Sequence, residues 1–467
     1  MRIGIGVPPE GTRGTGPEIV VKLLSSEAWL TNRPDGRQSE RLATSWTWDD
    51  ARTTLRLRLR KDVYFHDGDR LTPEIAAASL RETQKNAANE TFSFMSVREI
   101  VPSGEDTVDI KLSEVNSFIV PDLSAVVLEK PGKPGVATGP FQIVSRSEQA
   151  FKLAAFSRYH RGRPGLDEIE IINYPTQRNA WAAMMRGEID MLHEVSRDAA
   201  EFVEAESTVK AYSFPRPYYI PLVFNVRHAT LKSKEVRKAI NEAMDREALV
   251  RHGMSGRGTP ADAPIFSQHW SYSGATAPFG FNAAKAMQRL DDAGFRARMR
   301  SGDGVTSRFS FTCLVYAGDT RFDRLAVLVQ KQLADVGIDM KLQPLPLKAF
   351  ADRLKSGDFD AFIFEMAGRS LSWVYEFWRS HDGALNNSGY KSADAVLDRI
   401  RSGRSEEEIR AAVAELERIM HEDPPAAFLV WQETSRAVST NFDVHPEDRR
   451  DILVNLWQWR PASRGDR

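Results

Sequence analysis

Residues 42–72 read LATSWTWDDARTTLRLRLRKDVYFHDGDRLT, the most regular stretch of the chain. Over residues 53–60, leucine alternates with arginine, which predicts an antiparallel strand with one face in the core and the other in water. A turn is expected at residues 67–69, because Asp-Gly-Asp favours a reversal of the chain. Thr72 then suits an N-cap and Pro73 the first helical position, so we expect a helix from there to about residue 85.

A second regular pattern covers residues 309–342 and predicts a β-α-β unit. An apolar strand is expected at residues 309–316, and Gly337 is expected to end the helix that follows it. The helix would bury a stripe of apolar side chains: Leu325, Leu328, Val329, Leu333 and Val336. Alternation resumes at Ile338, so the two strands should be parallel with a right-handed crossover. An antiparallel early region followed by such a unit predicts an α/β chain with lobes of different character.

Three further helices and one strand are expected from local signals. Residues 179–186 should form a short helix that ends at Gly187. Ser233 is expected to cap a helix, and Ser405 begins a capping box before another helix. Residues 427–431 form an apolar run that predicts a buried strand.

The composition excludes several classes of protein. The 467 residues carry 63 basic and 64 acidic side chains, for a net charge of -1, and a nucleic-acid binder usually has a basic excess. No run approaches the roughly 18 apolar residues that a membrane helix needs. The start of the sequence has no apolar segment typical of a signal peptide. The single cysteine, Cys313, lies in an apolar run and is expected to be a buried structural thiol.

A search for chemical motifs finds no sign of catalysis. The nine histidines form no H-E-x-x-H motif, there is no cluster of Cys and His, and no G-x-S-x-G elbow is present. Gly4 and Gly6 lie on an expected first strand, but the third glycine of a dinucleotide fingerprint is missing. We therefore expect no catalytic residue, no metal site, no cofactor and no nucleic-acid partner.

A series of short motifs gives a more specific indication of family. In chain order they are LATSW (42–46), VYFHDGDRLT (63–72), ATGPF (137–141), YHRGRP (159–164), GEID (187–190), FN (224–225), VRKAI (236–240), AMDR (243–246), GI (337–338) and GDFD (357–360). Their identity and order resemble the family 5 bacterial extracellular solute-binding proteins, whose members carry dipeptides, oligopeptides, nickel complexes and some sugars. Most of these motifs are expected to serve the fold, with Asp245 and Arg246 as an ion pair at a helix end.

The resemblance implies a periplasmic-binding-protein-like, two-lobed α/β fold of the cluster C type. Lobe I would consist of residues 1–40, 136–224 and 433–467, with residues 41–135 inserted as an extra subdomain. Lobe II would be residues 225–432, and the lobes would close on the ligand about a hinge. Composition alone supports only one part of this division, a boundary near residues 129–136, which are rich in proline and glycine.

The same resemblance implies the substrate-binding protein of an ABC importer, which is not an enzyme. It would be a monomer that passes a small solute, peptide-like, opine-like or other, to the permease subunits. It would act in the periplasm or at the outer side of the membrane, attached only through the permease or through a lipid anchor that this sequence lacks.

The expected site departs from that of peptide-binding relatives. Those proteins have a W-x-x-D element whose acid receives the α-ammonium of the peptide, whereas Met366 and Arg369 occupy the matching positions here. With a shift in alignment, Glu365 could supply the acid. An arginine would favour an anionic ligand over a free-amine peptide. Residues expected to contact the ligand are Arg369, Trp373, Tyr375, Tyr218, Tyr219 and Asn225. Core packing of the aromatic residues, and a solvent-facing Arg369, remain open alternatives.

Two other functions are considered. The first is a cytosolic ligand-sensing receptor of the same fold, although residues 1–40 are too short for the DNA-binding domain that such receptors carry. The second is a hydrolase, which no motif in the sequence indicates.

Overall fold

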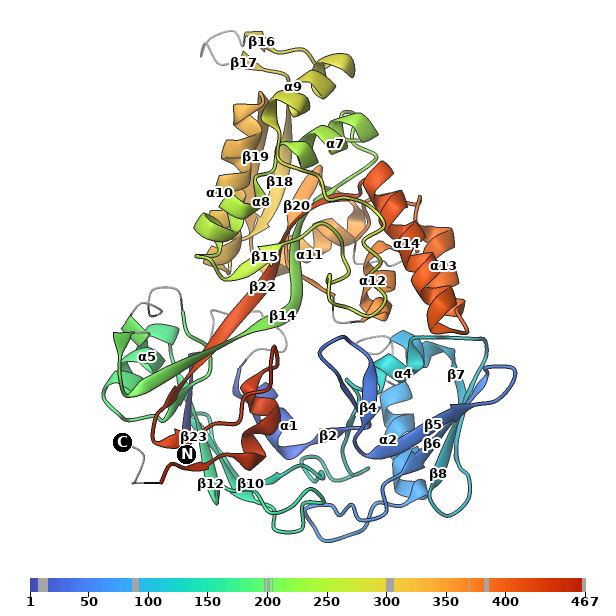
Figure 1. Ribbon diagram of the computed structural model, residues 1–467, viewed down its shortest axis with the longest axis vertical. Coiled ribbons are helices and arrows are strands. Elements are labelled where there is room, and N and C mark those ends of the chain that lie inside the picture. Colours follow the sequence, from blue (N-terminus) through green and yellow to red (C-terminus); the bar gives the residue numbers. More distant parts are fainter. Residues whose placement is uncertain are drawn as a thin grey trace. The chain divides into compact units, whose positions relative to one another are not determined.

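The computed structural model describes residues 1–6, 16–85, 92–196, 199, 202, 203, 205–299, 306–368, 370–381 and 386–463. The chain forms two compact units. Unit 1 comprises residues 1–215 and 434–467, and unit 2 comprises residues 216–433. The chain passes between them twice, within the long strands β14 (Val209–Phe224) and β22 (Ala426–Ser439) (Figure 1). The first passage lies several residues before the expected lobe boundary at residue 224.

The main sheet of unit 1 has the order β10-β11-β12-β1-β13-β22. Strand β1 is parallel to β12 and β13, while β10, β11 and β12 pair antiparallel. Helix α1 packs on β10, β11 and β12, and helix α5 packs on β1 and β12. The bounds are β1 Arg2–Gly6, α1 Pro17–Ser25, β10 Phe141–Arg146, β11 Ala150–Ala155, β12 Glu168–Tyr174, α5 Gln177–Met185 and β13 Met191–Leu192.

A four-stranded antiparallel sheet, β5-β6-β8-β7, forms a separate part of unit 1. Strand β6 is the one expected from the Leu/Arg alternation, and its leucines are buried while its arginines are exposed. Helix α2 packs on β7 and β8, and the part has an apolar core of its own, drawn from residues 29–128. The bounds are β5 Ala43–Trp48, β6 Thr54–Leu59, α2 Pro73–Lys85, β7 Val97–Pro102 and β8 Thr107–Leu112.

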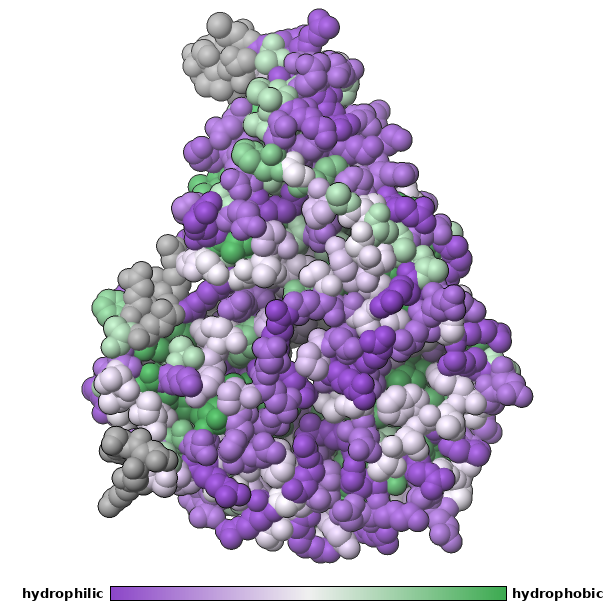
Figure 2. All heavy atoms as spheres, in the orientation of Figure 1, coloured by the Kyte–Doolittle hydropathy of each residue, from purple (hydrophilic) through white to green (hydrophobic). Residues whose placement is uncertain are grey.

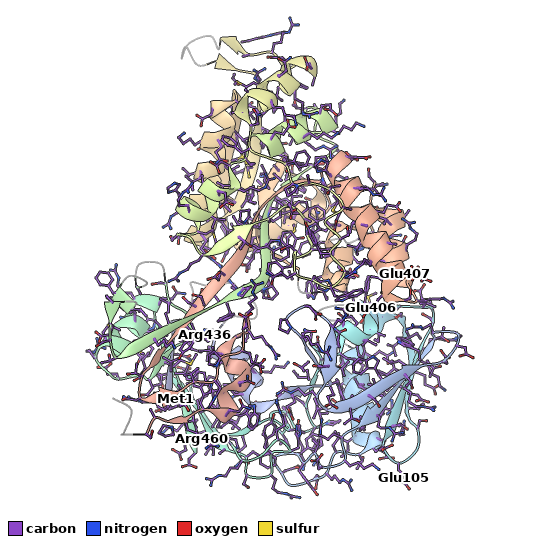
Figure 3. The ribbon with its side chains drawn as sticks, in the orientation of Figure 1. Met1, Glu105, Glu406, Glu407, Arg436 and Arg460 are labelled. Atoms are coloured by element: carbon purple, nitrogen blue, oxygen red, sulfur yellow. The ribbon has the colours of Figure 1, made fainter. Side chains whose placement is uncertain are left out.

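Short elements surround these sheets. Strands β2 and β9 pair with each other, as do β3 and β4, and β23 and β24. The bounds are β2 Glu27–Ala28, β3 Leu30–Asn32, β4 Gln38–Glu40, α4 Ile119–Asp122, β9 Val127–Leu128, β23 Phe442–Asp443 and β24 Arg460–Pro461. The unit-1 end of β22 is fixed by Arg436, labelled in Figure 3, whose guanidinium donates to both carboxylate oxygens of Asp451.

The sheet of unit 2 has the order β22-β14-β20-β18-β19, with β15 paired to β22 and β21 paired to β14. The expected β-α-β unit is present, since β18 is parallel to β19 and to β20, and α10 packs on β18 and β19. Cys313 of β18 is fully buried in the core of this unit, as expected. The bounds are β15 Gly258–Pro260, β18 Phe309–Tyr316, α10 Thr320–Asp335, β19 Ile338–Leu345, β20 Ala361–Ile363 and β21 Met366–Ala367.

Helices cover this sheet. Their bounds are α7 Lys234–Glu242, α8 Arg246–Ala248, α9 Ala283–Asp292, α11 Leu347–Ser356, α12 Leu371–Trp378, α13 Asp394–Ser402 and α14 Glu406–Glu422. A two-stranded ribbon, β16 (Arg298–Met299) with β17 (Thr306–Ser307), follows α9. Helices α13 and α14 pack side by side (Figure 1). The Ser405 side chain accepts from the Glu408 amide, as the capping box predicts, and Figure 3 labels Glu406 and Glu407 in the first turn of α14.

Two local expectations were wrong. Ser233 precedes α7, but its side chain makes no capping hydrogen bond. Asp245 and Arg246 do not pair with each other: Asp245 accepts from the Ala248 amide, whereas the buried Arg246 donates to backbone carbonyl groups that include Ala261 and Phe428. Arg246 therefore satisfies buried carbonyl oxygens, which an ion pair at the surface would not do.

The surface in view is mainly hydrophilic, with hydrophobic residues in scattered patches (Figure 2). Within the described ranges, no helix is both long and apolar enough to span a membrane.

Candidate functional site

A network of polar side chains lies in unit 2 where parallel strands end. Asp319 and Arg321 follow the carboxyl end of β18, and Glu365 follows the carboxyl end of β20. Arg216 on β14 and Gln432 on β22 complete the set, which we call the Gln432 network. Open α/β sheets bind ligands beyond the carboxyl ends of their strands, which makes this location a candidate site.

Gln432 is the centre of the network and is only 2% exposed. Its Oε1 accepts from Arg321 at 2.8 Å and from Arg216 at 3.4 Å, while its Nε2 donates to Glu365 Oε2 at 2.9 Å. The two guanidinium groups lie 3.8 Å and 3.7 Å from the same carboxylate oxygen. Because one buried amide connects three charged groups, their positions are set before any ligand arrives.

Asp319 gives the network a second carboxylate. It caps α10 by accepting from the Arg321 amide at 2.9 Å, and it also accepts from Arg321 Nε. The charges therefore balance, with two guanidinium groups against two carboxylates. All four charged side chains are partly exposed, so they can offer both donors and acceptors to a ligand.

Aromatic residues of unit 2 pack together around Trp431, the neighbour of Gln432 in sequence. The Trp431 ring, next to Gln432, lies 4.9 Å from Tyr219 and 5.3 Å from Phe266 between ring centroids. Gly368 lies against Trp431, and a Cβ at this position would come within 2.3 Å of the indole. Only glycine allows this approach, so the segment after β21 is fitted to the aromatic group.

The residues expected to bind ligand fall into different environments. Tyr218 is half-buried, and the Arg216 guanidinium lies over its ring, 5.0 Å from the ring centroid. Tyr218 therefore lies beside the network. Tyr219 is fully buried and accepts from Trp378 Nε1 at 2.9 Å. Asn225 donates to the carbonyl groups of Gly357 and Phe359 and accepts from Arg227. Its side chain is thus occupied in joining β14 to the turn before β20.

Two of the remaining expected residues, Tyr375 and Trp373, lie on helix α12. Tyr375 is 8% exposed and donates to Asp398 at 2.9 Å, and Arg401 donates to its hydroxyl. Trp373 is half-buried on α12. Arg369 lies outside the described residues. A ligand contact by any of these side chains stays a prediction.

The sequence analysis missed the Gln432 network, although one signal for it was available. The β-α-β unit was recognised, and its first turn, Asp319-Thr320-Arg321, is the position where such units bind ligands. Gln432 gave no signal, because it follows directly after the predicted strand 427–431. The observed β22 continues past it to Ser439.

The described residues bear on metal binding and on the chemistry of the single cysteine. Among them, no group of three His, Cys, Asp or Glu side chains is placed to hold a metal ion. Burial strongly raises the pKa of the Cys313 thiol, so the side chain stays neutral within the core.

Comparisons with known proteins give a family model, relatives and solved structures that this chain resembles. Residues 38–387 match the family model described as bacterial extracellular solute-binding proteins, family 5 Middle. The oligopeptide-binding protein AppA of Bacillus subtilis is 26% identical over 443 residues, which cover 86% of this chain and 80% of AppA. Heme-binding protein A of Haemophilus influenzae is 24% identical, over 82% of this chain and 77% of its own. Among solved structures, NikA of Brucella suis in complex with Fe(III)-EDTA superposes with a TM-score of 0.86 at 19% identity, covering 99% of this chain and 100% of NikA.

Proposed function

Because the chain belongs to the bacterial extracellular solute-binding proteins of family 5, we propose that it captures a small polar solute at the Gln432 network. Members of this family bind solutes for ABC importers, which favours this function over a cytosolic sensor. The observation that carries the location is the set of two arginines and one carboxylate connected through one buried amide, with the second carboxylate, Asp319, hydrogen-bonded to Arg321.

The chemistry of the network favours one class of ligand. A balanced group of donors and acceptors suits a solute that itself carries both, such as a zwitterion or a polar amide. The relatives are named for oligopeptides and heme, and NikA was solved with an iron chelate, so the shared fold accepts very different solutes. Within this class, Arg369 would favour solutes with an excess of negative charge over free-amine peptides, and this preference remains part of the proposal.

Delivery completes the proposed role. The solute would pass to the permease of an ABC importer, with the protein acting as a monomer on the outer side of the membrane and without catalysis. The family's description as extracellular supports this placement. Strands β14 and β22, the two connections between the units, would carry any closing motion.

The first experiment identifies the ligand. Mass spectrometry of small molecules released from the purified protein by denaturation should recover an intact polar solute, which then serves for calorimetry. An altered product in place of the added solute would contradict binding without catalysis.

The second experiment tests the location. Arg321→Ala removes one of the two guanidinium groups of the network, together with its hydrogen bonds to Gln432 and Asp319, so affinity should fall by about tenfold or more. Arg399→Ala is the matched control, because Arg399 also pairs with one carboxylate in unit 2, that of Glu415, away from the network. Equal affinity in wild type and Arg321→Ala would rule out the network as the site.

The preference for anions is tested separately. Calorimetry of wild type and Arg369→Glu with anionic solutes and with free-amine peptides should show selectivity moving toward peptides in the variant. Unchanged selectivity would contradict the role of Arg369.

A further inference from the structure

A hollow in unit 2 shares no residue with the Gln432 network. It measures about 570 Å³ and lies between the start of α7, the loop around Tyr390 and the end of α14. It is lined by Val226, Lys232, Lys234, Arg237, Gly389, Tyr390, Lys391, Ser392, Ile419, Glu422 and Asp423. Val226 follows the end of β14, whereas Arg216 lies near the middle of that strand, so the two sites are separated by roughly 25 Å of extended chain.

The lining of the hollow has an excess of positive charge. Lys232, Lys234 and Lys391 are exposed, and within the described part of the chain none of them forms an ion pair within 4.0 Å. Asp423, one of the two acids, is already occupied by Arg237 at 2.6 Å and by the Ser392 hydroxyl. The lysines thus face the hollow without a matching set of acids.

The start of α7 adds to this positive field. Lys232 and Lys234 flank Ser233, which stands at the N-cap but makes no side-chain capping bond. A helix N-terminus carries a partial positive charge and backbone N–H groups that can bind an anion.

Two buried side chains of the lining give an independent indication of a missing partner. Tyr390 is 4% exposed and Arg237 is 3% exposed. The Tyr390 hydroxyl lies near Ser392, but neither it nor Arg237 Nε makes a hydrogen bond of ordinary geometry among the described residues. The other Arg237 nitrogens donate to Asp423 and Pro424. Buried polar groups are almost always satisfied by protein, water or a bound ion, so two such orphans at one hollow point to an occupant.

We propose that this hollow binds a phosphate-type oxyanion. Several acceptor oxygens and more than one negative charge match three unpaired lysines, a helix N-terminus and two unsatisfied donors. The volume falls in the range of small-molecule sites, so the anion can carry an organic group. Inorganic phosphate and the phosphate of an anionic lipid headgroup share this chemistry, and the site is independent of the solute site proposed above.

The main test is calorimetry with inorganic phosphate at low ionic strength. Wild type should bind phosphate, and the double variant Lys232→Ala/Lys391→Ala should bind it about tenfold more weakly or not at all. Lys341→Ala is the matched control, because Lys341 is also an exposed lysine of unit 2 but lies outside the hollow. Equal binding by wild type and the double variant would overturn the proposal.

Tyr390→Phe separates a binding role from a structural one. Removal of an unpartnered hydroxyl should leave the melting temperature unchanged or raise it, while phosphate affinity falls. Unchanged phosphate affinity in this variant would contradict the part assigned to Tyr390.

Vesicles distinguish the two sources of the anion. Co-sedimentation with phosphatidylglycerol but not with phosphatidylcholine, lost in the double variant, would identify a lipid headgroup. Phosphate binding without vesicle binding would identify a soluble phosphate compound. Absence of both phosphate binding and vesicle binding would overturn the proposal.

Discussion

Glu27 is a buried acid whose charge is stabilised by three hydrogen-bond donors. Its carboxylate is fully buried in unit 1 and accepts from Arg41 Nε at 3.0 Å, from the Tyr159 hydroxyl at 3.0 Å and from His160 Nε2 at 3.1 Å. Burial, the largest influence, raises the pKa of Glu27, but the hydrogen bond from His160 and the charge of Arg41 together outweigh it. The pKa therefore lies below its ordinary value of 4.5.

We expect Glu27→Gln to destabilise the protein by about 3 kcal/mol, because it leaves Arg41 buried without its partner charge. Denaturant unfolding at neutral pH measures this change. Glu18→Gln, an exposed glutamate of α1, is the matched control and should change stability by less than about 0.5 kcal/mol. A loss no larger than that of the control would show that the cluster is dispensable.

The same residue predicts a dependence on pH. Since the folded-state pKa is depressed, the stability from Glu27 is present above the unfolded value near 4.5 and is lost as pH falls through the folded value. Wild type should therefore lose stability below pH 4.5 more steeply than Glu27→Gln. Parallel stability curves for the two proteins would contradict this account.

At the scale of an element, Gly6 shows how β1 and α5 meet. A Cβ on Gly6 would lie 2.3 Å from the Cα of Gln177, the first residue of α5. Gly6→Ala should therefore push the helix from the strand and cost about 2 kcal/mol in the free energy of unfolding. Gly280→Ala is the control, because nothing lies within 4 Å of a Cβ there. A Gly6 variant as stable as the control would show that α5 adjusts freely.

Substitution of the two serines that precede helices α14 and α7 should have different effects on stability. Ser405→Ala should cost about 1 kcal/mol, because the hydroxyl caps α14 by accepting from the Glu408 amide at 3.1 Å. Ser233→Ala should change stability little, since its side chain caps nothing. Thermal unfolding of both variants measures the difference, and equal losses would contradict the assigned caps.

Elements with a strong local period could be predicted from the sequence, whereas the candidate site could not. The Leu/Arg alternation of β6 and the apolar stripe of α10 reflect local packing, and both are observed. The Gln432 network joins residues from β14, β22, the start of α10 and the segment after β20, which only the folded sheet brings together. No local sequence pattern indicates that Gln432 is buried beside Glu365.

For the whole molecule, function depends on how binding is linked to folding. A solute that binds only the folded protein at one hundred times its Kd adds about 2.7 kcal/mol to the free energy of unfolding. The Gln432 network draws its residues from strands β14 and β22, the start of α10 and the segment after β20, so a solute held there would link these four parts of unit 2. A bound solute should thus stabilise the whole unit-2 sheet against unfolding, and not only the residues that it contacts.

Hydrogen exchange tests this linkage. The recovered solute should slow exchange at the carboxyl ends of β18 and β20 and around Gln432, and it should raise the melting temperature of wild type and of Arg399→Ala alike. Arg321→Ala should show neither effect at the same solute concentration, because its donor to Gln432 is lost. If the solute slows exchange in wild type only outside those segments, it binds elsewhere, because a bound ligand reduces local opening of the backbone that it contacts.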